Sequence, residues 1–159
     1  MNKYQVIRQA LTLQTCNLVK DAMTIMKDNQ YFIRGIPLSN RSAFVDGLPV
    51  THDCWSIYSS TITESLLLTI QPFVEETFGI KVHPTYSFCR IYWTGADMVK
   101  HVDRPACEYS VSLCISVDPE PWSIWFDNEE LFLNPGDIVV YKGTEVEHWR
   151  NAYKGKEQY

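Results

Sequence analysis

Three residues in the second half of the chain are of types that could together hold one metal ion. His101 and Asp103 are separated by a single residue, and residues two apart on an extended segment project to the same side. His148 follows a predicted strand, which could pack opposite the first segment and supply a third ligand. Two imidazoles and one carboxylate on one face of an octahedron suit non-haem Fe(II) and leave the opposite face open.

The spacing alone leaves this hypothesis open, because a His-x-Asp pair also occurs as an ordinary hydrogen-bonded pair at a protein surface. The remaining histidines are weaker candidates. His52 adjoins Asp53 in a segment of loop composition, and His83 precedes Pro84 at the entrance to a predicted strand. The metal hypothesis therefore depends on the elements that surround the three residues.

The elements before residue 80 are predicted to be a strand and two helices. Residues 3–10 favour a short strand, and apolar residues at helical spacing predict a helix over 13–27. The same spacing predicts a second helix over 61–78, which Gly79 can end. Pro72 lies inside this helix, so we expect a kink or a break there.

From residue 82 onward, short runs of aromatic and β-branched residues alternate with turn residues. The predicted strands are 86–93, 108–117, 123–126, 130–133 and 137–142. Short strands separated by turns are typical of an antiparallel sandwich or barrel. We therefore expect one α+β, mainly β domain over 1–159, in which residues 1–80 support a β core formed by residues 82–150.

Two stretches of this β-rich half resemble the 2-oxoglutarate/Fe(II)-dependent dioxygenases, closest to their prolyl-hydroxylase-like branch with its small phage and bacterial members. They read YSFCRIYWTGADMVKHVDRPACEYSVSLCIS and PGDIVVYKGTEVEHWR. The family pattern of Tyr-x-x-Gly, His-x-Asp, several strands, Pro-Gly-Asp and a distal His occurs here in order, at Tyr92, Gly95, His101, Asp103, Pro135–Gly136–Asp137 and His148. The resemblance implies a double-stranded β-helix (jelly roll), with the Pro-Gly-Asp segment as a turn between two of its strands.

The resemblance also implies an activity. Such a protein would bind Fe(II) as cofactor and 2-oxoglutarate as co-substrate, and would hydroxylate an unactivated C–H bond with succinate and CO2 as co-products. The substrate would be a prolyl or other protein residue, or an amino-acid-like small molecule. Asp103 favours hydroxylation, because related halogenases lack this carboxylate and coordinate halide in its place.

The contacts to 2-oxoglutarate are less well defined than the metal ligands. Tyr92 matches the family tyrosine that bonds the co-substrate. Relatives carry Arg or Lys for the C5 carboxylate on their last barrel strand, but Gln occupies the corresponding position 158 here. The candidates for this cation are Arg150, then Lys156, then Arg104. Relatives continue with a further strand, whereas the sequence here ends at Tyr159, so we expect either a trimmed chain or a barrel that closes with little.

Two further features could contribute to a substrate site. Residues 34–51 have loop composition and could form a lid or a surface loop. Tryptophans in or beside the β-rich half favour core and rim packing, although one or two of them could line the substrate mouth: Trp93, Trp122, Trp125 and Trp149.

Two alternative functions use the same residues. A jelly-roll module could bind a metal or a small ligand without turnover, and the missing basic residue at position 158 favours this alternative. A zinc hydrolase would need a general base beside the metal-bound water, for which only Glu108 or Glu145 is available, and their spacing singles out neither.

Composition limits the remaining classes. The net charge of -5 argues against nucleic acid as the default partner. The chain has neither an apolar run long enough for a membrane span nor a signal-peptide pattern at its start. Its five cysteines form no Cys-x-x-Cys pair, which suits reduced thiols and a cytoplasmic location.

Overall fold

The computed structural model describes residues 3–32, 44–45, 48–49, 54–119 and 121–159. In chain order, the elements are β1 (Tyr4–Ile7), α1 (Leu13–Phe32), β2 (Phe44–Val45), β3 (Leu48–Pro49), β4 (Cys54–Tyr58), α2 (Thr61–Phe78), β5 (Phe88–Trp93), β6 (Met98–His101), the short 3-10 helix η1 (Pro105–Cys107), β7 (Tyr109–Leu113), β8 (Val117–Asp118), β9 (Ile124–Phe126), β10 (Glu129–Leu131), β11 (Ile138–Lys142), β12 (His148–Arg150) and β13 (Glu157–Gln158).

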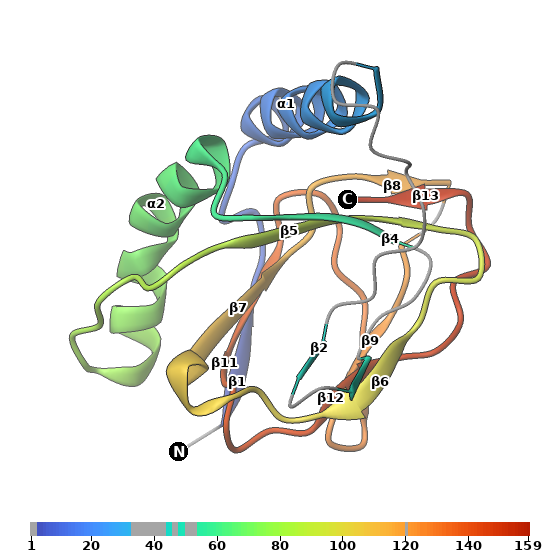
Figure 1. Ribbon diagram of the computed structural model, residues 1–159. Helices are drawn as coiled ribbons and strands as arrows, with labels where there is room; N and C mark the ends of the chain where they lie inside the picture. The colour runs from blue at the N-terminus through green and yellow to red at the C-terminus, as the bar shows by residue number, and fades with distance from the viewer. Residues whose placement is uncertain (1–2, 33–43, 46–47, 50–53, 120) are drawn as a thin grey trace.

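The strands form antiparallel sheets that face one another. Their orders are β1–β11–β7, β4–β5–β13–β8 and β10–β9–β12–β6, and β2 pairs with β3. In Figure 1, α1 and α2 lie beside the first two sheets, whereas β6, β9 and β12 lie on the side away from the helices. The predicted class, α+β with mainly antiparallel strands, is confirmed.

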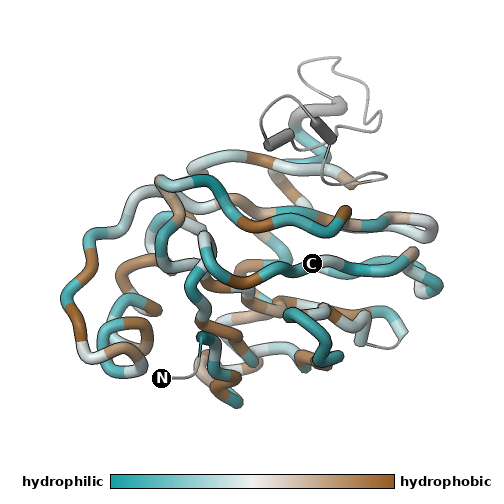
Figure 2. The backbone as a smooth tube through the Cα atoms, turned by 90° about the horizontal axis from the view of Figure 1, so that it is seen from below, coloured by the Kyte–Doolittle hydropathy of each residue, from teal (hydrophilic) through white to brown (hydrophobic). Residues whose placement is uncertain are grey.

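Alternation along the strands divides the interior into two layers. On β11, Ile138 and Val140 pack with the helices, whereas Val139 and Tyr141 pack toward β6 and β9. Figure 2 shows the matching changes between hydrophobic and hydrophilic residues along the backbone. Strands with a period of two thus bury one set of side chains under the helices and turn the other set toward the opposite sheet.

The second helix begins and ends where the sequence predicts. Ser60 caps its start by accepting a hydrogen bond from the Thr63 backbone, and Gly79 ends it with a φ of 65°. Of the kink or break expected at Pro72, the break does not occur, because α2 continues through this residue. Pro72 lies on the exposed side of the helix, where water can satisfy the Leu68 carbonyl that lost its backbone partner.

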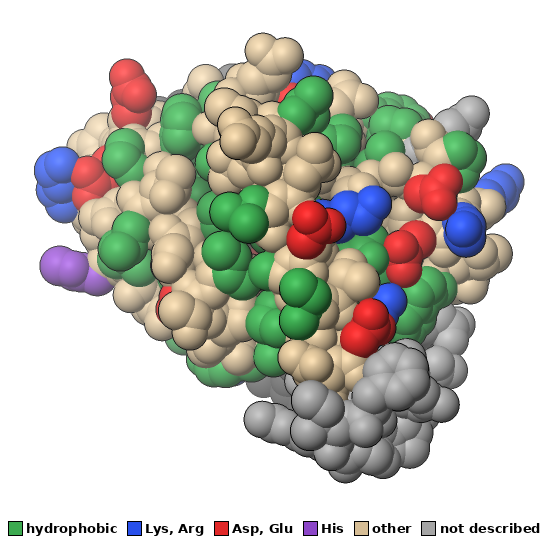
Figure 3. All heavy atoms as spheres, turned by 90° about the horizontal axis from the view of Figure 1, so that it is seen from above, with side chains coloured by type: hydrophobic (Ala, Val, Ile, Leu, Met, Phe, Trp, Pro, Cys, Tyr) green, Lys and Arg blue, Asp and Glu red, His purple; other side chains and the backbone are tan. Residues whose placement is uncertain are grey.

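The first helix runs to Phe32, beyond the predicted end at residue 27, and buries Cys16, Val19 and Met23 as its spacing indicates. Its outward side carries exposed Leu13, Leu18 and Ile25. Figure 3 views the molecule from the side of α1 and shows hydrophobic side chains interspersed with acidic and basic ones. Neither described helix combines the length and the apolar character needed to cross a bilayer.

The β part differs from the prediction mainly in its short strands. The run 108–117 divides into β7 and β8, and β4 has no counterpart in the predicted set. The sheet closes with little, which was one of the two expected alternatives: β13 has only two residues, and they pair with both β5 and β8. The predicted lid over residues 34–51 falls mostly outside the described residues.

The Pro-Gly-Asp turn that precedes β11 is held by the buried carboxylate of Asp137. This carboxylate accepts hydrogen bonds from the backbone N–H groups of Asn134 (2.9 Å) and Gln9 (3.0 Å) and from the Arg8 guanidinium (2.7 Å). Asp137 therefore bonds the local backbone of the turn and also ties the end of β1 to it. Burial alone would raise the pKa of Asp137, but these donors outweigh it and lower the pKa from 3.8.

We predict that Asp137→Asn lowers the free energy of unfolding by about 1.5–3 kcal/mol at neutral pH, because it removes charge-assisted bonds from a buried site. A carboxyl whose pKa is lower in the folded state stabilises the fold above its unfolded-state value, and this contribution is lost as the pH falls through the folded value. The difference from wild type should therefore shrink below about pH 4. Urea unfolding across pH measures it, with exposed Asp21→Asn as the control, and a difference independent of pH would contradict the assignment.

Candidate metal centre

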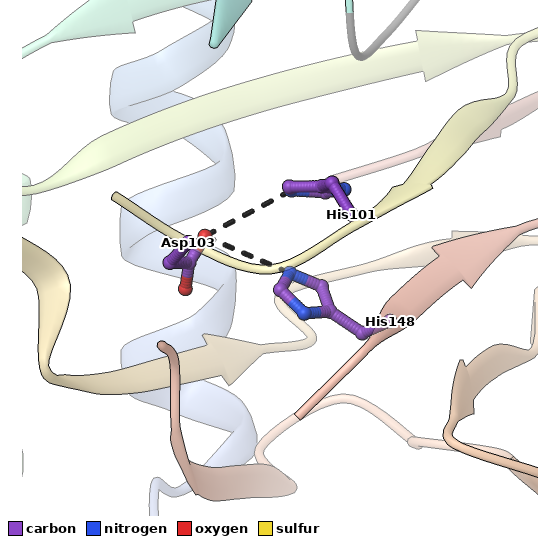
Figure 4. A group of neighbouring side chains, drawn as sticks. All are labelled: His101, Asp103 and His148. Carbon is purple, nitrogen blue, oxygen red and sulfur yellow. Dashed lines mark ion pairs between the residues drawn. The ribbon is translucent and has the colours of Figure 1, made fainter. Parts of the chain in front are cut away.

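The pairing of β6 with β12 brings the two candidate histidines together. His101 ends β6, His148 begins β12, and the two residues are direct partners in the antiparallel register. Asp103 follows two residues after His101 and turns toward both rings, as Figure 4 shows. Residues far apart in the sequence thus meet because one backbone ladder aligns them.

The donor atoms of this triad converge on one point. The Oδ1 atom of Asp103 lies 3.8 Å from His101 Nε2 and 3.7 Å from His148 Nε2. One potential ligand atom of each residue lies within 4.8 Å of those of the other two. A single ion could contact all three atoms, so the donor set fits the metal that the sequence suggests.

Hydrogen bonds hold both imidazoles in the form that a metal needs. His101 Nδ1 lies 2.7 Å from the Val99 carbonyl oxygen, and His148 Nδ1 lies 3.1 Å from that of Val146. Because a carbonyl oxygen only accepts, Nδ1 carries the proton in each ring. The lone pairs of both Nε2 atoms therefore remain free for a metal.

His148 lies in a nearly dry environment. His148 is 2% exposed. Its ring stacks on Phe126 with 5.7 Å between ring centres and meets Tyr141 edge-on with 4.9 Å between ring centres. Burial lowers the pKa of His148, although the Asp103 carboxylate opposes this shift. The neutral ring is the state in which histidine binds metals.

Asp103 is positioned by two neighbours that the sequence did not single out. Ser110 Oγ donates to Asp103 Oδ2 at 2.6 Å, which leaves Oδ1 directed at the histidines. The Asp103 N–H donates to the Gly143 carbonyl at 2.7 Å. A Cβ at position 143 would lie 2.6 Å from Asp103 Oδ2 and collide with the Cys107 carbonyl oxygen, so this close approach requires glycine.

A cavity of about 640 Å³ extends from the triad between the facing sheets. Tyr92 and Arg150, two of the predicted co-substrate residues, line its inner part, where Arg150 is 8% exposed. Arg104 lies at the outer part, with its guanidinium over the Tyr86 ring at 4.8 Å and its Nε donating to the Tyr86 hydroxyl. The structure thus brings three of the four predicted residues to the cavity, at different depths.

Lys156 is the exception. Its side chain is 82% exposed, and its Nζ lies 3.8 Å from the Asp118 carboxylate, away from the residues that line the cavity. Arg90, which is not among the three ranked candidates for the cation, also lines the cavity, from β5. The available signal was its spacing of two residues from Tyr92, which places both side chains on one face of a strand.

The tryptophans and the glutamates named above do not reach this cavity. Trp122 packs on Tyr92 and Tyr153, and Trp125 stacks on Trp149 at 5.6 Å; in the described part of the chain, no tryptophan lines the cavity. Glu145 pairs with Lys142, and neither it nor Glu108 is among the described lining residues. The geometry therefore gives a zinc hydrolase no general base from these two residues.

Comparisons with known proteins show where this fold occurs. No family model and no curated protein matches the sequence. A prolyl-4-hydroxylase from Pseudomonas putida superposes with a TM-score of 0.71 at 12% identity, covering 99% of this chain and 89% of that one. The viral collagen prolyl hydroxylase of Paramecium Bursaria Chlorella virus-1, in complex with 2-oxoglutarate, gives 0.63 at 15% identity and covers 99% and 92%.

A 2-oxoglutarate/Fe(II) oxygenase-family oxidoreductase from Burkholderia pseudomallei gives a TM-score of 0.56 at 12% identity, over 98% of this chain and 81% of that one. Similarity therefore extends along almost the entire chain. The fold is the one shared by prolyl hydroxylases and other 2-oxoglutarate/Fe(II) oxygenases, and it carries a candidate His-x-Asp…His iron site.

We predict that Ser110→Ala weakens Fe(II) binding about 10- to 100-fold, because the substitution frees the Asp103 carboxylate to turn away from the histidines. Anaerobic titration of the metal-free protein measures the affinity. Ser112→Ala is the matched control, since Ser112 lies one same-face step along β7 and has no hydrogen bond to the triad among the described residues. Equal losses of Fe(II) affinity in both variants would contradict the role of Ser110, because they would show a general effect on strand β7.

Proposed function

We propose that this protein is a 2-oxoglutarate- and Fe(II)-dependent oxygenase that hydroxylates an unactivated C–H bond. The observation that carries the proposal is the convergence of three metal-ligand atoms at one end of a cavity between the facing sheets of this fold. We further propose that the facing strands constitute the double-stranded β-helix expected from the sequence.

The chain's own residues would hold and orient the reacting groups. The Nε2 atoms of His101 and His148 and the Oδ1 atom of Asp103 would occupy one face of the ion, which leaves the other face for co-substrate and dioxygen. When bound, the iron and 2-oxoglutarate supply the oxidising power for C–H cleavage. The overall reaction would convert substrate, 2-oxoglutarate and O2 into hydroxylated substrate, succinate and CO2.

Two features of the site favour hydroxylation: water is excluded on one side of the metal site, and a carboxylate occupies one ligand position. Phe126 and Tyr141 pack around His148 and keep water from its side of the site. Asp103 occupies the ligand position that halide takes in related halogenases, as the sequence resemblance implies. A carboxylate fixed there by Ser110 leaves no place for halide at that position.

The outer part of the cavity supports a prolyl residue in an extended protein segment as the substrate. Tyr58 (54% exposed) and Phe88 (40% exposed) line it together with Tyr86, and the Tyr58 ring lies 4.7 Å from Tyr86 and 6.2 Å from Phe88. Aromatic-lined grooves bind proline-rich segments because flat rings pack on pyrrolidine rings and extended proline segments are already stiff. The two prolyl hydroxylases of similar fold agree with this choice.

The first test is spectroscopic. Addition of Fe(II) and 2-oxoglutarate without oxygen should produce a visible charge-transfer absorption band, and oxygen should then yield succinate. His101→Ala should lose the band because it removes a ligand, whereas His83→Ala, which changes an exposed histidine outside the triad, should retain it. Wild-type protein that retains iron but gives neither the band nor succinate would contradict the proposal and favour a binding module without turnover.

The second test concerns the aromatic mouth. Tyr58→Ala should raise the KM for a proline-containing peptide roughly 2- to 12-fold, since an aromatic contact contributes about 0.5–1.5 kcal/mol. Iron and 2-oxoglutarate binding should be unchanged. Phe132→Ala is the matched control, because Phe132 is 49% exposed and does not line the cavity. Turnover of free proline with no preference for peptides would assign the site to a small molecule.

A further inference from the structure

Two arginines from opposite sheets converge at the inner part of the cavity. Arg90 extends from β5, and its Nη1 donates to the Tyr92 hydroxyl at 3.2 Å. Arg150 extends from β12, and its Nη1 donates to the backbone carbonyls of Trp122 (2.7 Å) and Ser123 (3.4 Å). The Arg150 guanidinium lies 4.8 Å from the centre of the Trp122 ring, which itself contacts Tyr92.

Neither arginine has a counter-charge among the described residues. None of the ion pairs there involves Arg90 or Arg150, and the groups that they contact are hydroxyl and carbonyl oxygens and aromatic rings. The Nε atom of Arg90 is buried and has no hydrogen-bond partner in this part of the chain. Buried cations without an anion are costly, so the inner cavity is suited to an anionic ligand.

The distance of these two arginines from the triad suits a short dicarboxylate that has one end bound at the metal. Arg150 lies two residues beyond His148 on one strand, a same-face step of roughly 6.5 Å into the barrel. Tyr141, which lines the same cavity, contacts the His148 ring at 4.9 Å. One end of a five-carbon chain at the metal would leave its other end near the guanidinium groups.

The other residues considered for binding the C5 carboxylate do not place a cation at the inner end of the cavity. Gln158 occupies the place on the last strand where relatives carry Arg or Lys, and its Oε1 accepts the Trp122 N–H at 2.9 Å. Gln158 is neutral, and Lys156 is exposed beside Asp118. Arg104 lies near the cavity mouth on Tyr86, so it does not mark the inner end.

We propose that Arg90, assisted by the Tyr92 hydroxyl and by Arg150, binds the C5 carboxylate of 2-oxoglutarate, so that the anchor has moved from the last strand to β5. The inference rests on the proposed function. The Nε of Arg90, which has no hydrogen-bond partner among the described residues, lies beside an Nη in the fork of donors that a carboxylate accepts.

The test compares 2-oxoglutarate with 2-oxopentanoate, which has the same chain length but no C5 carboxylate, by calorimetry on the Fe(II)-loaded protein without oxygen. Wild type should strongly prefer 2-oxoglutarate. Arg90→Gln should lose about 30-fold or more in 2-oxoglutarate affinity, the cost of removing one partner of a buried charge pair, with 2-oxopentanoate affinity unchanged. Arg90→Lys should regain part of the preference, and Lys156→Gln should match wild type.

A second measurement does not depend on the folding of Arg90→Gln. In the Zn(II)-loaded wild type, the arginine Nε–H resonance that is absent from Arg90→Lys should shift with 2-oxoglutarate and not with 2-oxopentanoate. Wild type that binds Fe(II) but neither oxo acid would overturn the proposed function itself. Wild-type preference for 2-oxoglutarate that survives in Arg90→Gln, or that is lost in Lys156→Gln, would leave the function standing and overturn the role of Arg90.

Discussion

The register between β6 and β12 is the constraint on which the site depends. It makes His101 and His148 direct partners, although long stretches of sequence separate them. A slip of one residue would turn one imidazole to the outer face, because side chains alternate along a strand. The rest of the structure holds this register: β9 pairs with the other edge of β12, and Val146, Phe126 and Tyr141 fill the layer around His148.

The buried charged side chains of this molecule have two different kinds of surroundings. Asp137 is enclosed by two backbone donors and Arg8, so its charge is satisfied and serves to join β1 to the turn before β11. Arg90 and Arg150 are also enclosed, but only by neutral groups among the described residues. The first arrangement is complete without a ligand, and the second is not. This contrast separates a carboxylate with a structural role from cations suited to binding.

The parts of the fold that the sequence predicted well are those with strong local signals. The bounds of α2 follow from apolar spacing and from Gly79, and the triad follows from His-x-Asp in a strand context with a distal histidine. The strand β13 has two residues, too few for any periodicity, and its position between β5 and β8 is a property of the closed sheet. Pro72 does not break α2, because the effect of a proline depends on which side of the helix faces water.

The same distinction explains why Arg150 was ranked as a candidate for the cation and Arg90 was not. Proximity in sequence to a metal ligand made Arg150 a candidate, whereas Arg90 reaches the cavity only because β5 faces β12 across the interior. A bound carboxylate requires a positive side chain at a given depth in the cavity, and any strand that reaches this depth can supply it. Because Gln158 bonds the Trp122 backbone, a cation on the adjacent strand β5 of the same sheet could serve the same end of the cavity. Under the proposed assignment of Arg90, the anchor would lie at the same depth from the metal as in relatives, but on a different strand.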